Sequence, residues 1–262
     1  MRWLNDILNG GPFNLWESSI FLCYRGSIAH GTYVPNSNPG SIDDKDVLGV
    51  VFPPGSYFWG LKRFEQFERT FEYWDVLIYD FRKFVNLLLK SNPNVLQALW
   101  TPEHHFLKTS EQFDTLKRNR NLFLSKRIYK SFCGYAYGQL HKMENMAYNG
   151  YMGEKRKGLV DKFGYDTKNA QHLIRLLRQG IDALCTGEIV VERPDANELK
   201  QIKLGAWSIE KVKRTADALF EDMKRALKDS KLPENPDFEA VDSLVSQMQF
   251  QQYAVVKDYS LV

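Results

Sequence analysis

The first hundred residues alternate between short apolar runs and turn signals. Residues 20–24 form a five-residue apolar run followed closely by a glycine, and residues 47–52 form a second run that a Pro-Pro-Gly turn stops. Residues 68–79 are rich in aromatic and β-branched side chains. Short runs of these residue types, bounded by glycine and proline, favour buried strands over helices. The pattern therefore predicts three strands in this part of the chain.

The apolar positions change to helical spacing at residue 81, and after about residue 108 this spacing continues almost throughout. The helix predicted from residue 167 has either Asp166 or Thr167 as its N-cap and Gly187 beyond its end. Four helices are predicted from the spacing, over residues 81–89, 167–185, 209–228 and 238–251.

Together these elements predict an α+β fold. A small mixed sheet with helices is expected over residues 1–108, and a mostly helical domain over residues 109–262. A chain of 262 residues is long enough to bury a core as one large domain or as two modest ones.

The segment 25–50, RGSIAHGTYVPNSNPGSIDDKDVLGV, contains the most informative polar residues. Asp44 and Asp46 stand two apart at the start of a predicted strand, so their side chains share a face. Two carboxylates on one face repel each other unless a cation lies between them, and oxygen ligands suit Mg²⁺ or Mn²⁺. Gly26 and Ser27 follow the preceding strand, where backbone N–H groups and a hydroxyl can approach phosphate oxygens.

Each of these signals alone is most often structural. A Gly-Ser after a strand is usually a turn, and an Asp-x-Asp is usually a solvated strand end. The two in this order, with Ser27 and Asp44 about 17 residues apart, arise together by chance much less often. A third acid on a neighbouring strand strengthens the pattern. Asp75 lies inside an apolar strand, where an unpaired charge is costly to bury, whereas Asp80 can serve as the N-cap of the next helix.

The sequence resembles the DNA polymerase β-like nucleotidyltransferase superfamily, whose hallmark is this Gly-Ser, then Asp-x-Asp, then a third carboxylate. It is most similar to a branch linked to RNA repair in bacteria and phage. The similarity spans roughly residues 20–205 and includes GSIAHGT, DDKDVLGV, DVLIYDFRKFVNLLLKSNPNVLQALW and GYDTKNAQHLIRLLRQGIDALCTGEI. Asp43 stands where such proteins often have serine, which adds charge near the metal ligands.

The resemblance implies a metal-dependent nucleotidyltransferase. Such an enzyme moves a nucleoside monophosphate from an NTP to an acceptor hydroxyl, RNA or tRNA among the candidates, and releases pyrophosphate. Residues 1–108 would be the catalytic domain, and residues 109–262 would complete the nucleotide cleft. The expected catalytic residues, which would also hold two Mg²⁺ or Mn²⁺ ions, are Asp44, Asp46 and Asp75, with Asp80 as the alternative third acid. The expected nucleotide-binding residues are Gly26, Ser27, His30, Lys168, His172 and Arg175.

Several of these residues also have a plainer interpretation. Lys168, His172 and Arg175 stand at i, i+4 and i+7, so they form one line along a helix. Such a line is either a phosphate clamp or a solvated face. His30 is either part of the loop architecture or a nucleotide contact. His104 and His105 are a lone pair without other ligands nearby, and we expect them to form a surface turn.

Composition narrows the partners and the compartment. Lys and Arg number 35 and Asp and Glu 32, so the net charge of +3 does not by itself imply nucleic-acid binding. The three cysteines lie far apart without a CxxC spacing, which favours a reducing compartment. No window holds about 18 uncharged apolar residues, so we expect a cytoplasmic protein without a membrane partner. The oligomeric state is not predicted.

Two other functions fit the same residues. One is a nucleotide- or RNA-binding module that keeps the fold without catalysis. The other is a toxin–antitoxin nucleotidyltransferase that modifies a protein or tRNA. The intact pair of Asp44 and Asp46 favours catalysis over the binding module, since a degenerate copy would be free to lose either acid.

Overall fold

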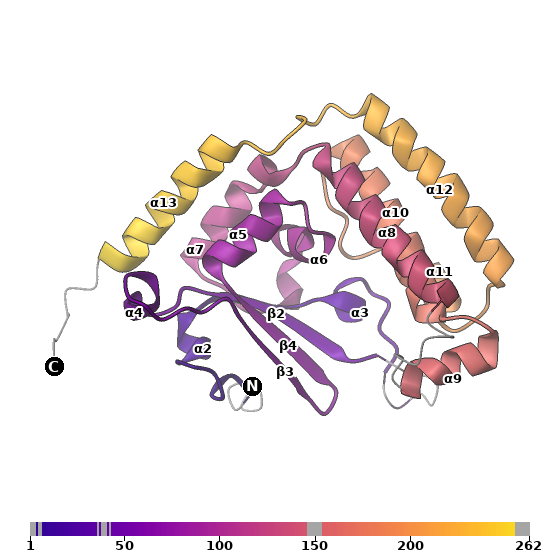
Figure 1. Cartoon of the computed structure of the whole chain (residues 1–262), viewed down its shortest axis with the longest axis horizontal. Coiled ribbons are helices and arrows are strands. Elements are labelled where there is room, and N and C mark those ends of the chain that lie inside the picture. The colour runs from indigo at the N-terminus through magenta and orange to yellow at the C-terminus, as the bar shows by residue number, and fades with distance from the viewer. Residues whose placement is uncertain are drawn as a thin grey trace.

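A computed structural model of the chain describes residues 4, 7–35, 37, 41, 43–145 and 154–254. These residues form a mixed sheet with the strand order β3-β4-β2-β1-β5, packed against helices (Figure 1). The strands are β1 Ser19–Tyr24, β2 Lys45–Val51, β3 Gln66–Phe71, β4 Trp74–Asp80 and β5 Phe106–Lys108. Strands β2 and β4 are parallel, and the other neighbouring strands are antiparallel.

The prediction of one long strand over residues 68–79 is wrong. The segment folds into two antiparallel strands, β3 and β4, joined by a tight turn in which Glu72 has a φ of 52°. A non-glycine residue rarely adopts this left-handed conformation. No glycine, proline or asparagine marks the turn in the sequence, so the aromatic run on both sides of it concealed the break.

Helices occupy most of the remaining chain. In the first half they are α2 Leu15–Ser18, α3 Gly26–Ala29, α4 Gly55–Phe58, α5 Phe81–Leu89, α6 Pro93–Leu96 and α7 Glu111–Arg118. Three short 3-10 turns are η1 Gln97–Trp100, η2 Glu103–His105 and η3 Arg120–Phe123. The second half contains α8 Arg127–Asn145, α9 Glu154–Phe163, α10 Thr167–Thr186, α11 Ala196–Lys203, α12 Ile209–Asp229 and α13 Phe238–Ala254. All four predicted helices are confirmed, as α5, α10, α12 and α13.

Capping fixes where the central helix α10 begins and ends. The Asp166 side chain accepts a hydrogen bond from the Asn169 backbone N–H at 2.9 Å, as an N-cap residue does. Gly187 follows the helix with a φ of 71°, the left-handed conformation that glycine adopts without strain. Within the described ranges, no helix combines the length and the apolar character needed to cross a lipid bilayer.

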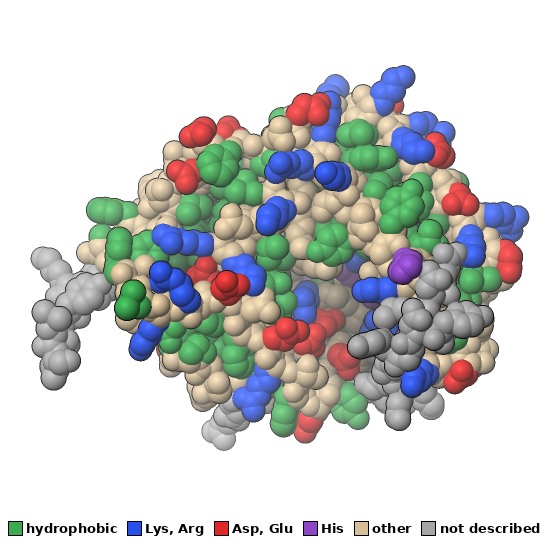
Figure 2. Space-filling model, viewed as in Figure 1, with side chains coloured by type: hydrophobic (Ala, Val, Ile, Leu, Met, Phe, Trp, Pro, Cys, Tyr) green, Lys and Arg blue, Asp and Glu red, His purple; other side chains and the backbone are tan. Residues whose placement is uncertain are grey.

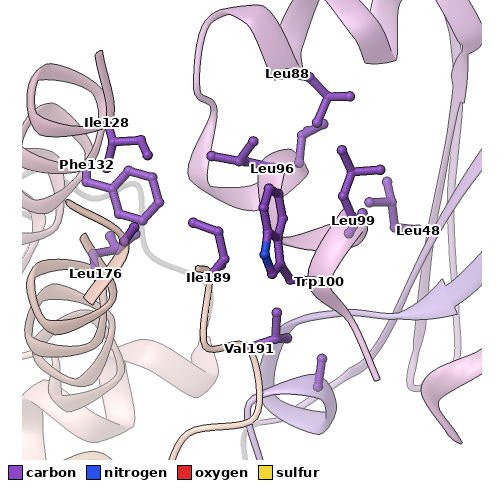
Figure 3. Close-up of a cluster of buried hydrophobic side chains, with 14 of the residues drawn as sticks. Leu48, Leu88, Leu96, Leu99, Trp100, Ile128, Phe132, Leu176, Ile189 and Val191 are labelled. Atoms are coloured by element: carbon purple, nitrogen blue, oxygen red, sulfur yellow. The ribbon is translucent and has the colours of Figure 1, made fainter. Parts of the chain in front are cut away.

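Alternation along the strands divides the core between two faces of the sheet. Leu48 and Leu77 face a large cluster that includes the helices of the second half, whereas Val47 and Val76 face a smaller cluster on the other side. In the large cluster, Trp100 lies close to Ile189 and Val191 of the segment after α10 (Figure 3). This core therefore includes residues from both sides of position 108, and a domain boundary at that position stays a prediction.

Candidate active site

A cavity of about 320 Å³ lies at the amino-terminal ends of β2 and β4, next to α3 and α10. Figure 2 shows this side of the molecule hollowed near the middle of the view, with acidic and basic side chains around the hollow. The cavity is lined by all nine residues that we expect in the site, namely Gly26, Ser27, His30, Asp44, Asp46, Asp75, Lys168, His172 and Arg175. Asp80, the alternative third acid, instead caps α5, because its side chain accepts hydrogen bonds from the first N–H groups of that helix.

The parallel pairing of β2 and β4 places Asp46 directly beside Asp75. Both side chains follow the same alternation as Leu48 and Leu77, so they face the helices of the second half. An Arg25 guanidinium nitrogen, Nη2, lies 3.3 Å from Asp75 Oδ2. The other oxygen, Asp75 Oδ1, is buried without a hydrogen-bond partner among the described residues. A buried oxygen of this kind is suited to a cation.

Asp46 lies in an environment that disfavours a bare negative charge. The pKa of its carboxyl is raised to about 6, chiefly by burial. The neighbouring carboxylates of Asp75 and Asp44 add to the increase, whereas Arg25 and Lys168 oppose it. A cation bound between these carboxylates would remove their repulsion and hold Asp46 ionised. The residues present therefore fit a divalent metal with oxygen ligands.

Gly26 permits a close approach between α3 and the acidic residues. Its φ is 61°, and a side-chain Cβ at this position would lie 2.2 Å from Asp46 Oδ2. Only glycine satisfies both the backbone conformation and the space. The hydroxyl oxygen of the next residue, Ser27, is buried without a hydrogen-bond partner among the described residues. The Gly-Ser pair thus presents a free hydroxyl beside the carboxylates.

Arg175 supplies positive charge from α10. The side chain is buried, and its Nη1 donates to Gln179 Oε1 at 2.9 Å, while no described residue forms a hydrogen bond with its Nε. Burial lowers the pKa of its guanidinium to about 10, which still leaves it charged at neutral pH. Within the described residues no carboxylate forms an ion pair with it. A buried cation without a counter-ion is costly, so an anion in the cavity would stabilise it.

The other two expected residues of α10 differ in charge. Lys168 Nζ lies 3.6 Å from Asp43 Oδ1. Burial lowers the pKa of His172 well below its usual value, and Arg175 and Lys168 lower it further. His172 is therefore neutral at pH 7 and can contribute a hydrogen bond but no charge.

His30 is held on two sides by the segment after α10. Its Nδ1 lies 3.0 Å from the backbone oxygen of Val191, and its own backbone oxygen accepts from the Arg193 N–H at 3.3 Å. Burial lowers the pKa of His30 well below its usual value. Of the two roles expected for His30, loop architecture and nucleotide contact, these contacts correspond to the first. His30 also lines the cavity.

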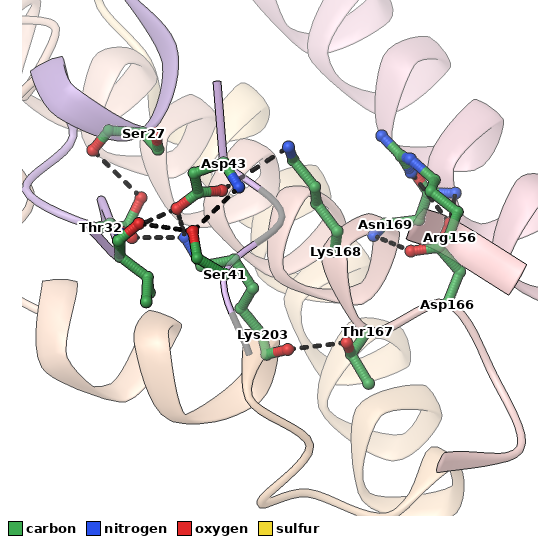
Figure 4. A network of polar contacts seen from close by, with 11 residues as sticks. Ser27, Thr32, Ser41, Asp43, Arg156, Asp166, Thr167, Lys168, Asn169 and Lys203 are labelled. Atoms are coloured by element: carbon green, nitrogen blue, oxygen red, sulfur yellow. Dashed lines mark hydrogen bonds and ion pairs between the residues drawn. The ribbon is translucent and has the colours of Figure 1, made fainter. Parts of the chain in front are cut away.

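Asp43 has a different role from the neighbouring acids. Its Oδ2 accepts from the Val34 N–H at 2.9 Å and forms an ion pair with Lys203 of α11, and its Oδ1 lies near Lys168 (Figure 4). Both Asp43 and Lys203 are buried. The charge that the sequence places next to the metal-ligand candidates is therefore balanced by two lysines, and Asp43 joins the sheet to the helical half.

We expect Lys203→Met to destabilise the protein by about 3 kcal/mol, because removing the closer partner of a buried ion pair leaves the Asp43 carboxylate with only the 3.6 Å contact to Lys168. The double variant Asp43→Asn, Lys203→Met should recover much of this loss. Urea unfolding of both variants measures the difference. Lys126→Met, which breaks the more exposed Lys126–Glu234 pair, is the control and should cost less than about 1 kcal/mol. Equal stability of the single and double variants would contradict the assigned role of Asp43.

The cavity also contains residues that sequence reasoning did not select. Arg25 precedes the Gly-Ser pair directly, so its place in the motif could have indicated it. Asn94, Gln97 and Gln171 have no such signal, because only the tertiary fold brings α6, η1 and α10 together. Arg156 of α9 also lines the cavity, and its Nη1 donates to Asp166 Oδ2 at 2.9 Å.

Comparison with known proteins places the chain in a family. No curated protein matches the chain. A solved structure of a nucleotidyltransferase-like protein from Exiguobacterium sibiricum 255-15 is 10% identical, with 98% of this chain and 79% of that chain covered and a TM-score of 0.30. Residues 17–247 match the model of the RNA repair pathway DNA polymerase beta family. Polymerase β-like families are nucleotidyltransferases that usually use divalent metals, which supports transferase chemistry in general. The match includes most of the chain, and the protein therefore belongs to the RNA repair pathway DNA polymerase beta family.

Proposed function

We propose that this protein transfers a nucleoside monophosphate from an NTP to an acceptor hydroxyl, with release of pyrophosphate. The observation that supports this most strongly is the arrangement of charge in one cavity. The carboxylates of Asp46 and Asp75 lie side by side on parallel strands, and Arg175 supplies a buried positive charge from α10 to the same cavity. The acids suit metal ions, and the cation suits the phosphates of the donor.

Two Mg²⁺ or Mn²⁺ ions are the proposed cofactors. Asp44 and Asp46 would hold both, and Asp75 would hold the ion nearer the acceptor. When bound, the ions lower the pKa of the attacking hydroxyl and neutralise the leaving pyrophosphate. The Oδ1 of Asp75, which has no hydrogen-bond partner in the described part of the chain, and the raised pKa of Asp46 support this ligand set.

The remaining residues would bind and orient the nucleotide. Gly26 and Ser27 would hold the β- and γ-phosphates through the close backbone approach and the free hydroxyl. Lys168 and Arg175 would balance the triphosphate charge, and His30 and His172 would border the nucleotide as neutral groups. Catalysis of this kind depends on positioning and charge stabilisation and needs no side-chain nucleophile.

We propose an RNA hydroxyl as the acceptor, in keeping with the description of the family. We also propose that the protein works in the cytoplasm. The test is incubation with each radiolabelled NTP, Mg²⁺ or Mn²⁺, and either total RNA or lysate protein. Label on RNA with stoichiometric pyrophosphate release is the expected result. Label on protein would support the toxin–antitoxin alternative instead. NTP binding without transfer to any acceptor would support the binding module.

Arg175→Ala should weaken NTP binding by about 10- to 100-fold, because a charge-assisted contact to phosphate contributes roughly 1.5–3 kcal/mol. The loss should be similar for ATP, GTP, CTP and UTP, since phosphate contacts do not distinguish bases. Calorimetric titration with Ca²⁺ in place of Mg²⁺ measures binding without turnover.

Arg178→Ala is the matched control. Arg178 lies one turn further along α10, is paired with Asp195 and Glu198, and is absent from the cavity lining. Its removal should leave NTP affinity unchanged. If Arg175→Ala also leaves the NTP affinity unchanged, Arg175 does not contact the nucleotide and has only a structural role in α10.

A further inference from the structure

Two histidines and a glutamate lie close together near the segment that follows α10. His104 and His105 belong to the 3-10 turn η2, and Glu192 lies on the segment between α10 and α11. One ligand atom from each of the three side chains lies within 4.8 Å of the others. His104 Nε2 is 3.7 Å from Glu192 Oε2. The two histidines do form a turn, η2, as predicted. The prediction that no other ligand type lies nearby is wrong, because Glu192 comes close from a distant part of the chain.

His105 is the fixed member of this cluster. It is only 7% exposed, and its Nε2 is buried without a hydrogen-bond partner among the described residues. Its ring lies against that of His104, with the centroids 4.1 Å apart. Burial and the neighbouring His104 lower the pKa of His105. Its buried Nε2, to which no described residue forms a hydrogen bond, is therefore open to a metal ion.

We propose that His104, His105 and Glu192 form a binding site for a divalent transition-metal ion of the zinc type. Two imidazoles and one carboxylate are ligands that such ions accept, whereas Mg²⁺ prefers oxygen ligands alone. Ligand atoms around a four-coordinate zinc ion stand about 3.4 Å apart, given bonds of about 2.0–2.1 Å. Modest side-chain rotation would bring the ligand atoms of the cluster from their present separations to this distance. The side chains of His104 and Glu192 can rotate in this way because they are 61% and 54% exposed.

The site joins two segments that form part of the cleft. The turn η2 follows η1, which supplies Gln97 to the cavity. The segment that supplies Glu192 also supplies the backbone contacts to His30, and its Val191 lies close to Trp100 in the core (Figure 3). A bound ion would fix this segment to the sheet half of the protein, and with it the position of His30. The ion is thus a structural clamp, separate from the cofactors of the reaction.

Zinc titration of the full chain against a chromophoric chelator tests the proposal. The parent for the test carries Asp44→Asn and Asp46→Asn, so that the carboxylates of the cleft do not bind the added zinc. We expect one zinc ion per chain in the parent. His104→Ala and Glu192→Gln should each weaken zinc binding by about tenfold or more, because each removes a ligand. His141→Ala, on α8, is the matched control and should not change the affinity.

Two further readouts separate a built site from loose surface binding. Zinc should raise the melting temperature of the parent and of His141→Ala, but not that of His104→Ala or Glu192→Gln. Cobalt substituted for zinc should give the strong visible absorption of a four-coordinate site. Equal zinc affinity in the parent and in both ligand variants, or no saturation at one equivalent, would overturn the proposal. The two variants replace exposed side chains, so the test does not depend on disturbing the buried His105.

Discussion

Asp46→Asn should lower the rate of nucleotidyl transfer by more than about 100-fold while the fold is retained. A metal ligand contributes more than the outer residues that orient it, whose loss alone typically costs about 10- to 100-fold. The apolar strand around Asp46 is unchanged by the substitution, so the circular dichroism spectrum should match that of the wild type. Turnover above a tenth of the wild-type value would show that the assignment of the metal ligands is wrong.

The same substitution should stabilise the metal-free protein at neutral pH. In the folded state the pKa of Asp46 is about 6, above its ordinary value of 3.8. Between these two values the folded state binds more protons than the unfolded state, so stability falls as the pH rises through this window. Asparagine has no proton to lose. The variant should therefore be more stable than the wild type above pH 6, by up to about 3 kcal/mol.

Calorimetry in EDTA at pH 4 and pH 7.5 tests this expectation. The advantage of Asp46→Asn should be present at pH 7.5 and shrink at pH 4, where the wild-type carboxyl is protonated. Added Mg²⁺ should raise the melting temperature of the wild type more than that of the variant. A variant less stable than the wild type at pH 7.5 without metal would contradict the unfavourable environment inferred for this carboxylate.

Asp75→Asn and Asp80→Asn should have opposite consequences. Asp75 lies beside Asp46 in register, so its replacement should reduce turnover by orders of magnitude with little loss of stability. Asp80 Oδ1 accepts from the backbone N–H groups of Arg82 and Lys83 at 2.9 and 3.1 Å. Because asparagine is also a good N-cap residue, Asp80→Asn should cost at most about 1 kcal/mol of stability and leave turnover nearly intact.

Steady-state turnover and urea unfolding, measured on both variants, decide between the two acids. The two variants serve as controls for each other, because each removes one carboxylate from the same strand, β4. Loss of turnover in Asp80→Asn with normal turnover in Asp75→Asn would transfer the third metal ligand to Asp80. Equal effects on turnover would show that neither acid has the assigned role.

Local patterns in the sequence predicted the elements and the acidic pair. The spacing of Asp44 and Asp46 indicated a shared face without knowledge of the fold, because alternation is a property of any strand. The N-cap role of Asp80 followed from its place before an apolar stripe. Helix α10 could be predicted almost to the residue, since both of its ends carry strong local signals.

Features that depend on tertiary pairing were not predictable in this way. The turn at Glu72 lacks the usual turn residues, so two strands were predicted as one. The partner of Asp43 is Lys203, which has no periodic or motif signal that links it to the acidic segment. The convergence of Glu192 with His104 and His105 depends in the same way on where the segment after α10 lies against the sheet half.

The ion pair between Asp43 and Lys203 has a consequence for synthesis on the ribosome. The two residues are 160 positions apart, and the contact between His30 and Val191 spans 161. The acidic residues therefore emerge long before the lysine that compensates Asp43 and before the helix that would meet the phosphates. A nascent chain that stops before α10 has the acids of the cleft without its opposite wall. We expect the cleft to mature late in translation, so that prematurely terminated products do not consume nucleotides.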